Sequence, residues 1–127
     1  VWTTPTYASG NFFGPGGMPW TVESGDVTTF EYMIIGKTMW MSFHLINTTI
    51  SGTADYNIYI AIPASKTAAK TITFTYMVYQ GNWVMACGNT APSGSTINLF
   101  PDVTQAAKWA LSTNATFLVG NIFFEIN

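Results

Sequence analysis

Few residues in this chain could do acid, base or nucleophilic chemistry. It has six carboxylates, four lysines, one histidine, one cysteine and no arginine. Catalysis needs such groups gathered in one place, but no nucleophile elbow, phosphate-binding loop or dinucleotide-binding glycine pattern is present. We therefore predict that the protein is not an enzyme and uses no cofactor. Carboxylates meeting at a subunit boundary to cleave a glycan remain an alternative.

The single imidazole, the single thiol and one acidic pair have structural interpretations. His44 lies between Phe43 and Leu45 in an expected strand and lacks the companion ligands that a metal needs. Cys87 ends an apolar segment, where a lone cysteine usually behaves as a small buried hydrophobe. Glu23 and Asp26 flank a Ser-Gly turn, where an Asp commonly accepts hydrogen bonds from local amides. We predict no metal site.

Aromatic residues beside turns are the better candidates for ligand binding. An aromatic ring can cover the apolar face of a sugar, while amides and carboxylates bond to its hydroxyl groups. One predicted set is Tyr79, Asn82 and Trp83 at a hairpin tip, and a second is Asp102 with Trp109. The alternative is that each aromatic ring belongs to the core or to a subunit interface.

The elements that must position these residues are short strands. Thr, Val, Ile and aromatic residues dominate, and runs with period-two alternation are separated by Gly, Pro and Asn. We predict one domain over residues 1–127, an all-β, compact antiparallel sandwich or small barrel with at most one short helical turn, at Val103–Leu111. The predicted strands are Met18–Glu23, Val27–Ile35, Lys37–Asn47, Asp55–Ile62, Thr71–Tyr79, Trp83–Gly88, Ser95–Phe100 and Thr116–Ile126.

Two of these strands, Lys37–Asn47 and Thr116–Ile126, are apolar on both faces. A strand with one solvated face should be apolar on one side only, and large exposed apolar patches mark interfaces. We therefore predict self-association, although a loop or the helical segment could cover the second face instead. The predicted oligomer-interface residues are Trp40, His44, Ile46, Phe124 and Ile126.

The composition excludes several classes of protein. Only 8% of residues are charged and the net charge is −2, whereas nucleic-acid binding depends on clustered Lys and Arg. No apolar run approaches the roughly 20 residues that span a bilayer, so we predict no membrane insertion. The first residues, Val1–Pro5, resemble no signal peptide.

Several segments together resemble the tip domains of bacteriophage tails and tail fibres. The resemblance starts with Trp2–Tyr7 and Trp20–Val27, which match a "W-TPTY … W-TV-xGDV" opening. It covers nearly the whole chain, but its motifs are turn and strand signatures without a chemical site. The later matching segments are Tyr32–Thr38, Ile60–Pro63, Thr96–Leu99 and Gly120–Ile126.

This resemblance implies a β domain at the C-terminal tip of a longer virion protein, made in the host cytoplasm. Such domains commonly form homotrimers and bind a host-surface receptor, either a glycan or a protein. The chain departs from the pattern at Trp40, Met41 and His44, where smaller residues are expected. The alternatives are a purely structural trimerisation domain of the virion and a lectin-like module of a secreted protein.

Overall fold

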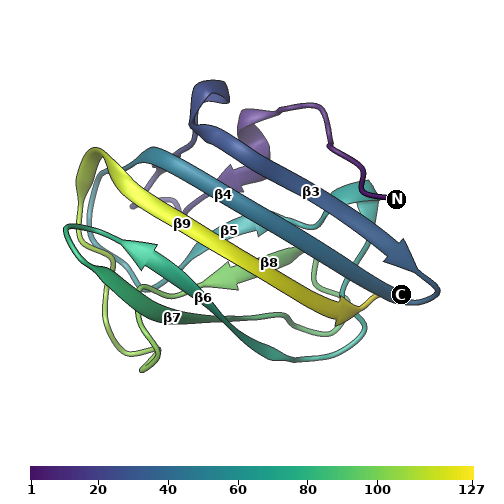
Figure 1. Cartoon of the computed structure of the whole chain (residues 1–127). Coiled ribbons are helices and arrows are strands. Elements are labelled where there is room, and N and C mark those ends of the chain that lie inside the picture. The colour runs from purple at the N-terminus through teal and green to yellow at the C-terminus, as the bar shows by residue number, and fades with distance from the viewer.

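A computed structural model describes all residues of the chain, Val1–Asn127, and shows nine antiparallel strands in one curved sheet (Figure 1). Three short 3₁₀ turns, Ser9–Asn11, Ser24–Asp26 and Pro63–Ser65, are its only helical elements. No helix in the structure has the length and hydropathy needed to cross a membrane. The strands are β1 (Phe12–Phe13), β2 (Trp20–Thr21), β3 (Val27–Ile35), β4 (Thr38–Ile50), β5 (Ile58–Ala61), β6 (Thr73–Tyr79), β7 (Trp83–Asn89), β8 (Thr96–Leu99) and β9 (Ser112–Glu125).

The sheet curls into a nearly closed barrel. Its strand order is β1-β5-β8-β7-β6-β9-β4-β2, with β3 also paired to β4. In Figure 1, β3, β4 and β9 run side by side in front, and β5 and β8 lie behind them. At the two ends of the order, the rings of Phe12 in β1 and Trp20 in β2 meet edge to face with centroids 5.8 Å apart. The predicted all-β antiparallel fold is confirmed.

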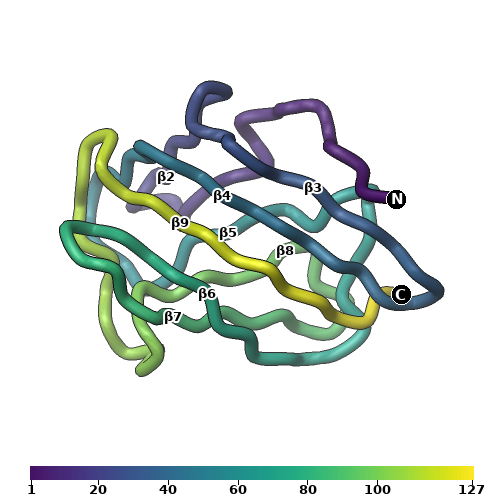
Figure 2. The backbone as a smooth tube through the Cα atoms, in the orientation of Figure 1, coloured from purple at the N-terminus to yellow at the C-terminus, as the bar shows by residue number.

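The N-terminal segment protects the outer edge of β3. The Thr3 N–H donates to the Tyr32 carbonyl at 2.7 Å, and the Tyr32 N–H donates back to the Thr3 carbonyl at 3.0 Å. The backbone trace shows this segment running next to β3 (Figure 2). An unpaired strand edge is a template for unwanted pairing with another chain. The bridge between Thr3 and Tyr32 covers part of the free edge of β3.

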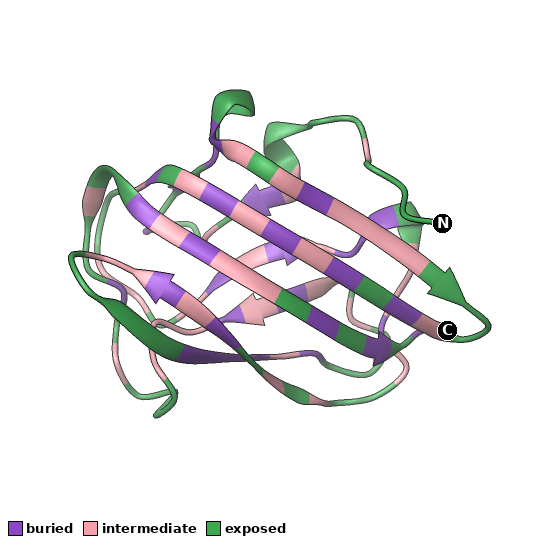
Figure 3. Ribbon diagram, viewed as in Figure 1, coloured by how far each residue is buried: buried purple, intermediate pink, exposed green.

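The core comes from one face of each strand. Along β4 and β9, buried residues alternate with less buried ones (Figure 3). Met39, Met41, Phe43 and Leu45 of β4 are each at most 1% exposed, so the predicted inward face of this strand is confirmed. Opposite Phe43 lies Gly120, where an added Cβ would come within 2.8 Å of the Phe43 ring.

The segment Val103–Leu111 is not helical, and that prediction is wrong. Gln105 has a positive φ of 59°, which a right-handed helix does not allow. Trp109 is held in the core, where its backbone N–H donates to Asp55 and its indole N–H donates to the Leu99 carbonyl. Long-range contacts to two other segments therefore determine the path of this segment.

The two central strands are longer than predicted. β4 continues to Ile50 because the backbone bulges near Asn47, whose φ is 54°, and then pairs with β9 again at Thr48. The buried Thr48 hydroxyl donates to the Thr116 carbonyl at 2.7 Å and accepts from the Trp20 indole N–H at 3.0 Å. A buried polar side chain with both bonds satisfied is tolerated in a core. The two-residue strand β1 was not predicted at all.

The close approach at Gly120 gives a stability prediction. We expect Gly120→Ala to lower the free energy of unfolding by about 1–3 kcal/mol, because the added methyl group overpacks a filled core. Urea unfolding followed by circular dichroism measures this change. Gly16→Ala is the control, since nothing lies within 4 Å of its added Cβ; equal stability of the two variants contradicts the prediction.

Candidate functional site

A row of three aromatic rings, one exposed and two partly exposed, lies at the β6–β7 hairpin. Tyr79 and Trp83 are cross-strand partners on either side of the turn, and Tyr79 also pairs with Phe117 of β9. The ring centroids are 5.2 Å apart for Tyr79 and Trp83, and 5.5 Å apart for Tyr79 and Phe117. Trp83 is 52% exposed. We call Phe117, Tyr79 and Trp83 the aromatic row.

Hydrogen bonds from Gln80 fix the hairpin against the rest of the domain. Its side-chain amide N–H groups donate to the Ala110 carbonyl at 2.9 Å and to the Thr116 hydroxyl at 2.8 Å. Asn82 is exposed in the same turn, beside Trp83. The structure thus brings together three predicted ligand residues, Tyr79, Asn82 and Trp83, on a supported turn. Sequence reasoning missed Phe117 as their neighbour.

The other two predicted ligand residues do not join this group. Asp102 closes its own turn, since its Oδ1 accepts from the Thr104 backbone N–H at 3.0 Å and from the Thr104 hydroxyl at 2.8 Å. Trp109 is only 1% exposed and belongs to the hydrophobic core. Its buried ring offers no face to a ligand, so the structure does not support its predicted role.

The predicted interface residues divide between the two faces of the sheet. Trp40, at 38% exposure, and the partly exposed His44 and Ile46 lie on the outer face of β4. Phe124 and Ile126 are 3% and 4% exposed inside this chain's own core. Their predicted place at an interface is not supported, because Phe124 shares the inward face of β9 with Leu118 and Ile122, and Ile126 is buried just beyond the end of this strand.

The residue of β9 that does accompany Trp40 is Phe123, which was not predicted. It is the cross-strand partner of Trp40 and is 60% exposed. The two ring centroids lie 4.8 Å apart with an angle of 31° between the ring planes. The odd-numbered residues of β9 from Phe117 to Phe123 point outward. This alternation could have identified Phe123 from the sequence as the outward neighbour of Trp40.

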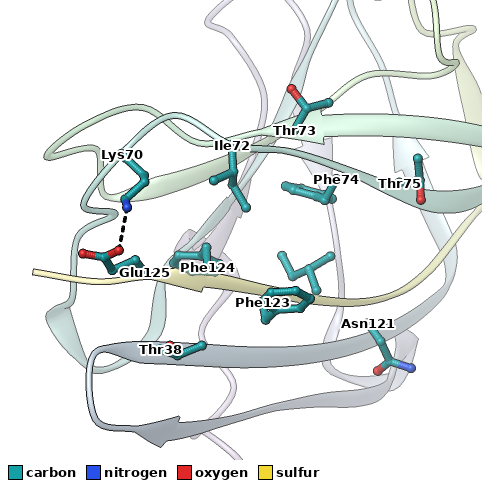
Figure 4. Close-up of a pocket in the computed structure, with 11 residues that line it drawn as sticks. Thr38, Lys70, Ile72, Thr73, Phe74, Thr75, Asn121, Phe123, Phe124 and Glu125 are labelled. Carbon is teal, nitrogen blue, oxygen red and sulfur yellow. Dashed lines mark ion pairs between the residues drawn. The ribbon is translucent and has the colours of Figure 1, made fainter.

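A groove of about 690 Å³ opens where β6 and β9 separate (Figure 4). The ladder between these strands spans only Tyr79↔Phe117 to Met77↔Val119. Beyond that point the groove lies between them, and its size is within the range of small-molecule sites. Its lining residues are Thr38, Lys70, Ile72, Thr73, Phe74, Thr75, Asn121, Ile122, Phe123, Phe124 and Glu125.

An ion pair closes one end of this groove. The Lys70 ammonium lies 2.7 Å from the Glu125 Oε2 (Figure 4), and both side chains remain about half exposed. The hydrogen bond from Lys70, and then its charge, hold the pKa of Glu125 below the ordinary value, with a smaller contribution from Lys37. The carboxylate is therefore a hydrogen-bond acceptor at neutral pH.

The remaining titratable groups serve local structure. The Glu23 backbone N–H donates to Asp26 Oδ2 at 2.9 Å, which confirms the predicted bonding of Asp26 to a local amide. Cys87 is buried, as predicted, with its thiol 3.5 Å from the Asp102 carbonyl. Burial raises the pKa of Tyr76 well above its usual value, so its hydroxyl remains a donor to the Phe100 carbonyl. No three His, Cys, Asp or Glu side chains gather as metal ligands.

The chain is similar to a solved structure, but not to any family model or curated protein. The chain is similar to the head domain of phage bIL170, whose crystal structure was described together with the question of a common fold for the receptor-binding domains of lactococcal phages. The identity is 18%, the match covers 87% of this chain and 99% of that one, and the TM-score is 0.42. Similarity this low transfers neither residues nor activity.

The ion pair makes a prediction about pH. We expect Lys70→Met to raise the pKa of Glu125 towards the ordinary glutamate value, because it removes the main hydrogen bond and charge that lower it. In the wild type, this ion pair adds a small stabilisation to the folded state. The stabilisation is fully present at pH values above the ordinary pKa of a glutamate, and it is lost as the pH falls through the lowered pKa of Glu125.

An NMR titration of the side-chain carboxyl carbons measures this shift. Lys66→Met is the matched control, because Lys66 does not contribute to the shift at Glu125. An unchanged pKa of Glu125 in the Lys70→Met variant contradicts the prediction.

Proposed function

We propose that this chain is a non-enzymatic receptor-binding domain of a bacteriophage tail or fibre tip, which trimerises and binds a glycan on the host surface. The observation that carries the proposal is the aromatic row at the β6–β7 hairpin. The sequence resemblance to phage tip domains, which extends over nearly the whole chain, supports the setting in a virion.

The geometry of the aromatic row suits a sugar better than an apolar partner. Trp83 is exposed and Tyr79 is partly exposed, and each ring also carries a polar group, the indole N–H or the phenol hydroxyl. Asn82 adds an amide at the same turn. A sugar needs an apolar surface for its C–H groups and hydrogen bonds for its hydroxyl groups, and this turn supplies both.

The outer face of β4 supports self-association. Trp40 is exposed, and it packs against the exposed ring of Phe123. His44 and Ile46 lie further along the same face. Exposed apolar side chains that are contiguous rather than scattered mark interaction surfaces. Three copies on one fibre would also multiply a weak affinity for each glycan through effective concentration.

A glycan array followed by titration calorimetry tests the binding site. We expect Trp83→Ala to weaken binding of the best wild-type glycan by about tenfold or more, because the ring face contacting the sugar is lost. Tyr56→Ala is the control, since Tyr56 is also an exposed aromatic residue, at 42%, but lies outside the aromatic row.

The outcomes separate the rival functions. If the wild type binds no glycan and no host cell, the purely structural role in the virion replaces the proposal. If Trp83→Ala binds as tightly as the wild type, the aromatic row is not the site. A wild type that binds glycans but is monomeric points to the lectin-like module.

The proposed interface has its own test. We expect Trp40→Ser to shift the wild-type oligomer towards monomers in light scattering, while the circular dichroism spectrum keeps its β signature, since Trp40 lies outside the core. Val103→Ser is the control, because Val103 is exposed at 54% in a loop. Unchanged assembly of Trp40→Ser removes this residue from the interface.

A further inference from the structure

The groove between β6 and β9 is an interruption of the backbone ladder. Met77 and Tyr79 pair with β9. Ile72 bonds on the β7 side instead, where its carbonyl accepts from the Thr90 backbone N–H and its N–H donates to the Thr90 hydroxyl. Because backbone groups point alternately to the two sides of a strand, the N–H and C=O groups of Thr73 and Thr75 face β9.

The same alternation places backbone groups of β9 on the opposite side of the groove. The Glu125 carbonyl accepts from the Ala69 N–H at 2.8 Å on the β6 side. Val119 pairs with Met77 on that side too. Asn121 and Phe123 lie between Val119 and Glu125 and are also odd-numbered, so their backbone N–H and C=O groups point to the β6 side as well. Neither residue has a ladder partner in β6. Peptide donors and acceptors therefore line both sides of the groove.

Side chains add an aromatic wall and hydroxyl groups to these backbone groups. Phe123 packs against Trp40 on the β4 side, and it also lines the groove. Figure 4 shows Ile72 and Phe74 on the β6 side of the groove and Phe123 and Phe124 on the facing strand β9. Thr73, Thr75 and Asn121 stand at the rims as exposed polar side chains. The lining combines apolar surface with many hydrogen-bonding groups.

The ion pair at the end of the groove has bonding capacity to spare. A lysine ammonium has three donors and a carboxylate has about four acceptor sites, and the contact between Lys70 and Glu125 Oε2 uses only part of each. Two neighbouring hydroxyl groups of a sugar can donate to the carboxylate and accept from the ammonium at once. The pair is neutral overall, so it gives no preference for an anionic ligand.

We propose that the β6–β9 groove is a second saccharide-binding site for sugars with a pair of adjacent hydroxyl groups, with no requirement for a negative charge on the sugar. This inference rests on the proposed glycan-binding function and extends it to a site separate from the aromatic row. Phe123 forms one wall, the backbone of Asn121 and Thr75 bonds to hydroxyl groups, and Lys70 with Glu125 recognises the diol. Phe123 is shared between this groove and the outer face of β4, and Thr38 of β4 also lines the groove, so the groove shifts are read together with the oligomeric state of each variant.

Amide NMR titrations of the wild-type chain test the second site. The probes are a neutral trihexose series and a sialylated trisaccharide of equal length. We expect the neutral probes to shift the amide signals of Thr75, Asn121 and Phe123, and the sialylated probe to shift them no more strongly at equal concentration, because the neutral ion pair gives an anionic sugar no advantage. Trp83→Ala should keep these shifts, because that residue lies outside the groove.

Two groove variants complete the test. Phe123→Ala and Glu125→Gln should each weaken the groove shifts by about tenfold, and both side chains are exposed, so folding is checked simply by circular dichroism. Thr28→Ala is the control, an exposed position of β3 away from the groove.

The failure of this inference is distinguishable from failure of the proposed function. Shifts confined to Tyr79–Trp83 leave the proposed function standing and overturn the groove site. Absence of any shift with every sugar, together with an empty glycan array, overturns both. Protection of the Asn121 and Phe123 amides from hydrogen exchange by an extended Thr/Val hexapeptide, without any sugar effect, assigns the groove to an added peptide strand and overturns the saccharide proposal.

Discussion

The long antiparallel pairing of β4 and β9 is the contact on which the rest of the structure depends. These strands have 13 and 14 residues, and their register runs from Thr38↔Glu125 to Ile50↔Ser112 with bulges near Thr48. Their inward side chains supply much of the core. Side chains of a strand alternate between its faces, so this register also determines which residues of both strands face outward.

Both proposed binding sites follow from where β6 meets this pair. The backbone ladder between β6 and β9 spans only Met77–Tyr79 of β6. Where the contact exists, cross-strand neighbours bring Phe117, Tyr79 and Trp83 together on the outer face. Where it ends, β9 continues alone and the groove opens next to it. One short ladder therefore separates an aromatic surface from a hydrogen-bonding cleft.

Local pattern in the sequence predicted every strand except the two-residue β1, but it could not predict which strands pair. β3 has the predicted bounds, and the inward face of β4 follows directly from alternation. The same alternation in β9 places Phe123 on the outer face and Phe124 on the inner face. The interface prediction named Phe124, which is the inward residue. Trp109 was misplaced because hydrogen bonds to Asp55 and Leu99 hold it, and no local pattern encodes contacts over those distances. The groove depends on the pairing of β6 with β9, which is also invisible in the sequence.

The scarcity of charge limits how this domain can recognise a partner. The chain has four lysines and no arginine, and Lys70 is paired with Glu125. The electrostatic field around the domain is therefore too weak to steer a charged ligand from a distance. Recognition must then come from short-range contacts, which are ring faces, peptide groups and hydroxyl groups. Such contacts give specificity at close approach but a modest affinity for each ligand. A surface of this kind is effective when several copies act together, which is why glycan binding and self-association form one proposal: the exposed face of β4 would supply the copies, and the hairpin and the groove would supply the contacts.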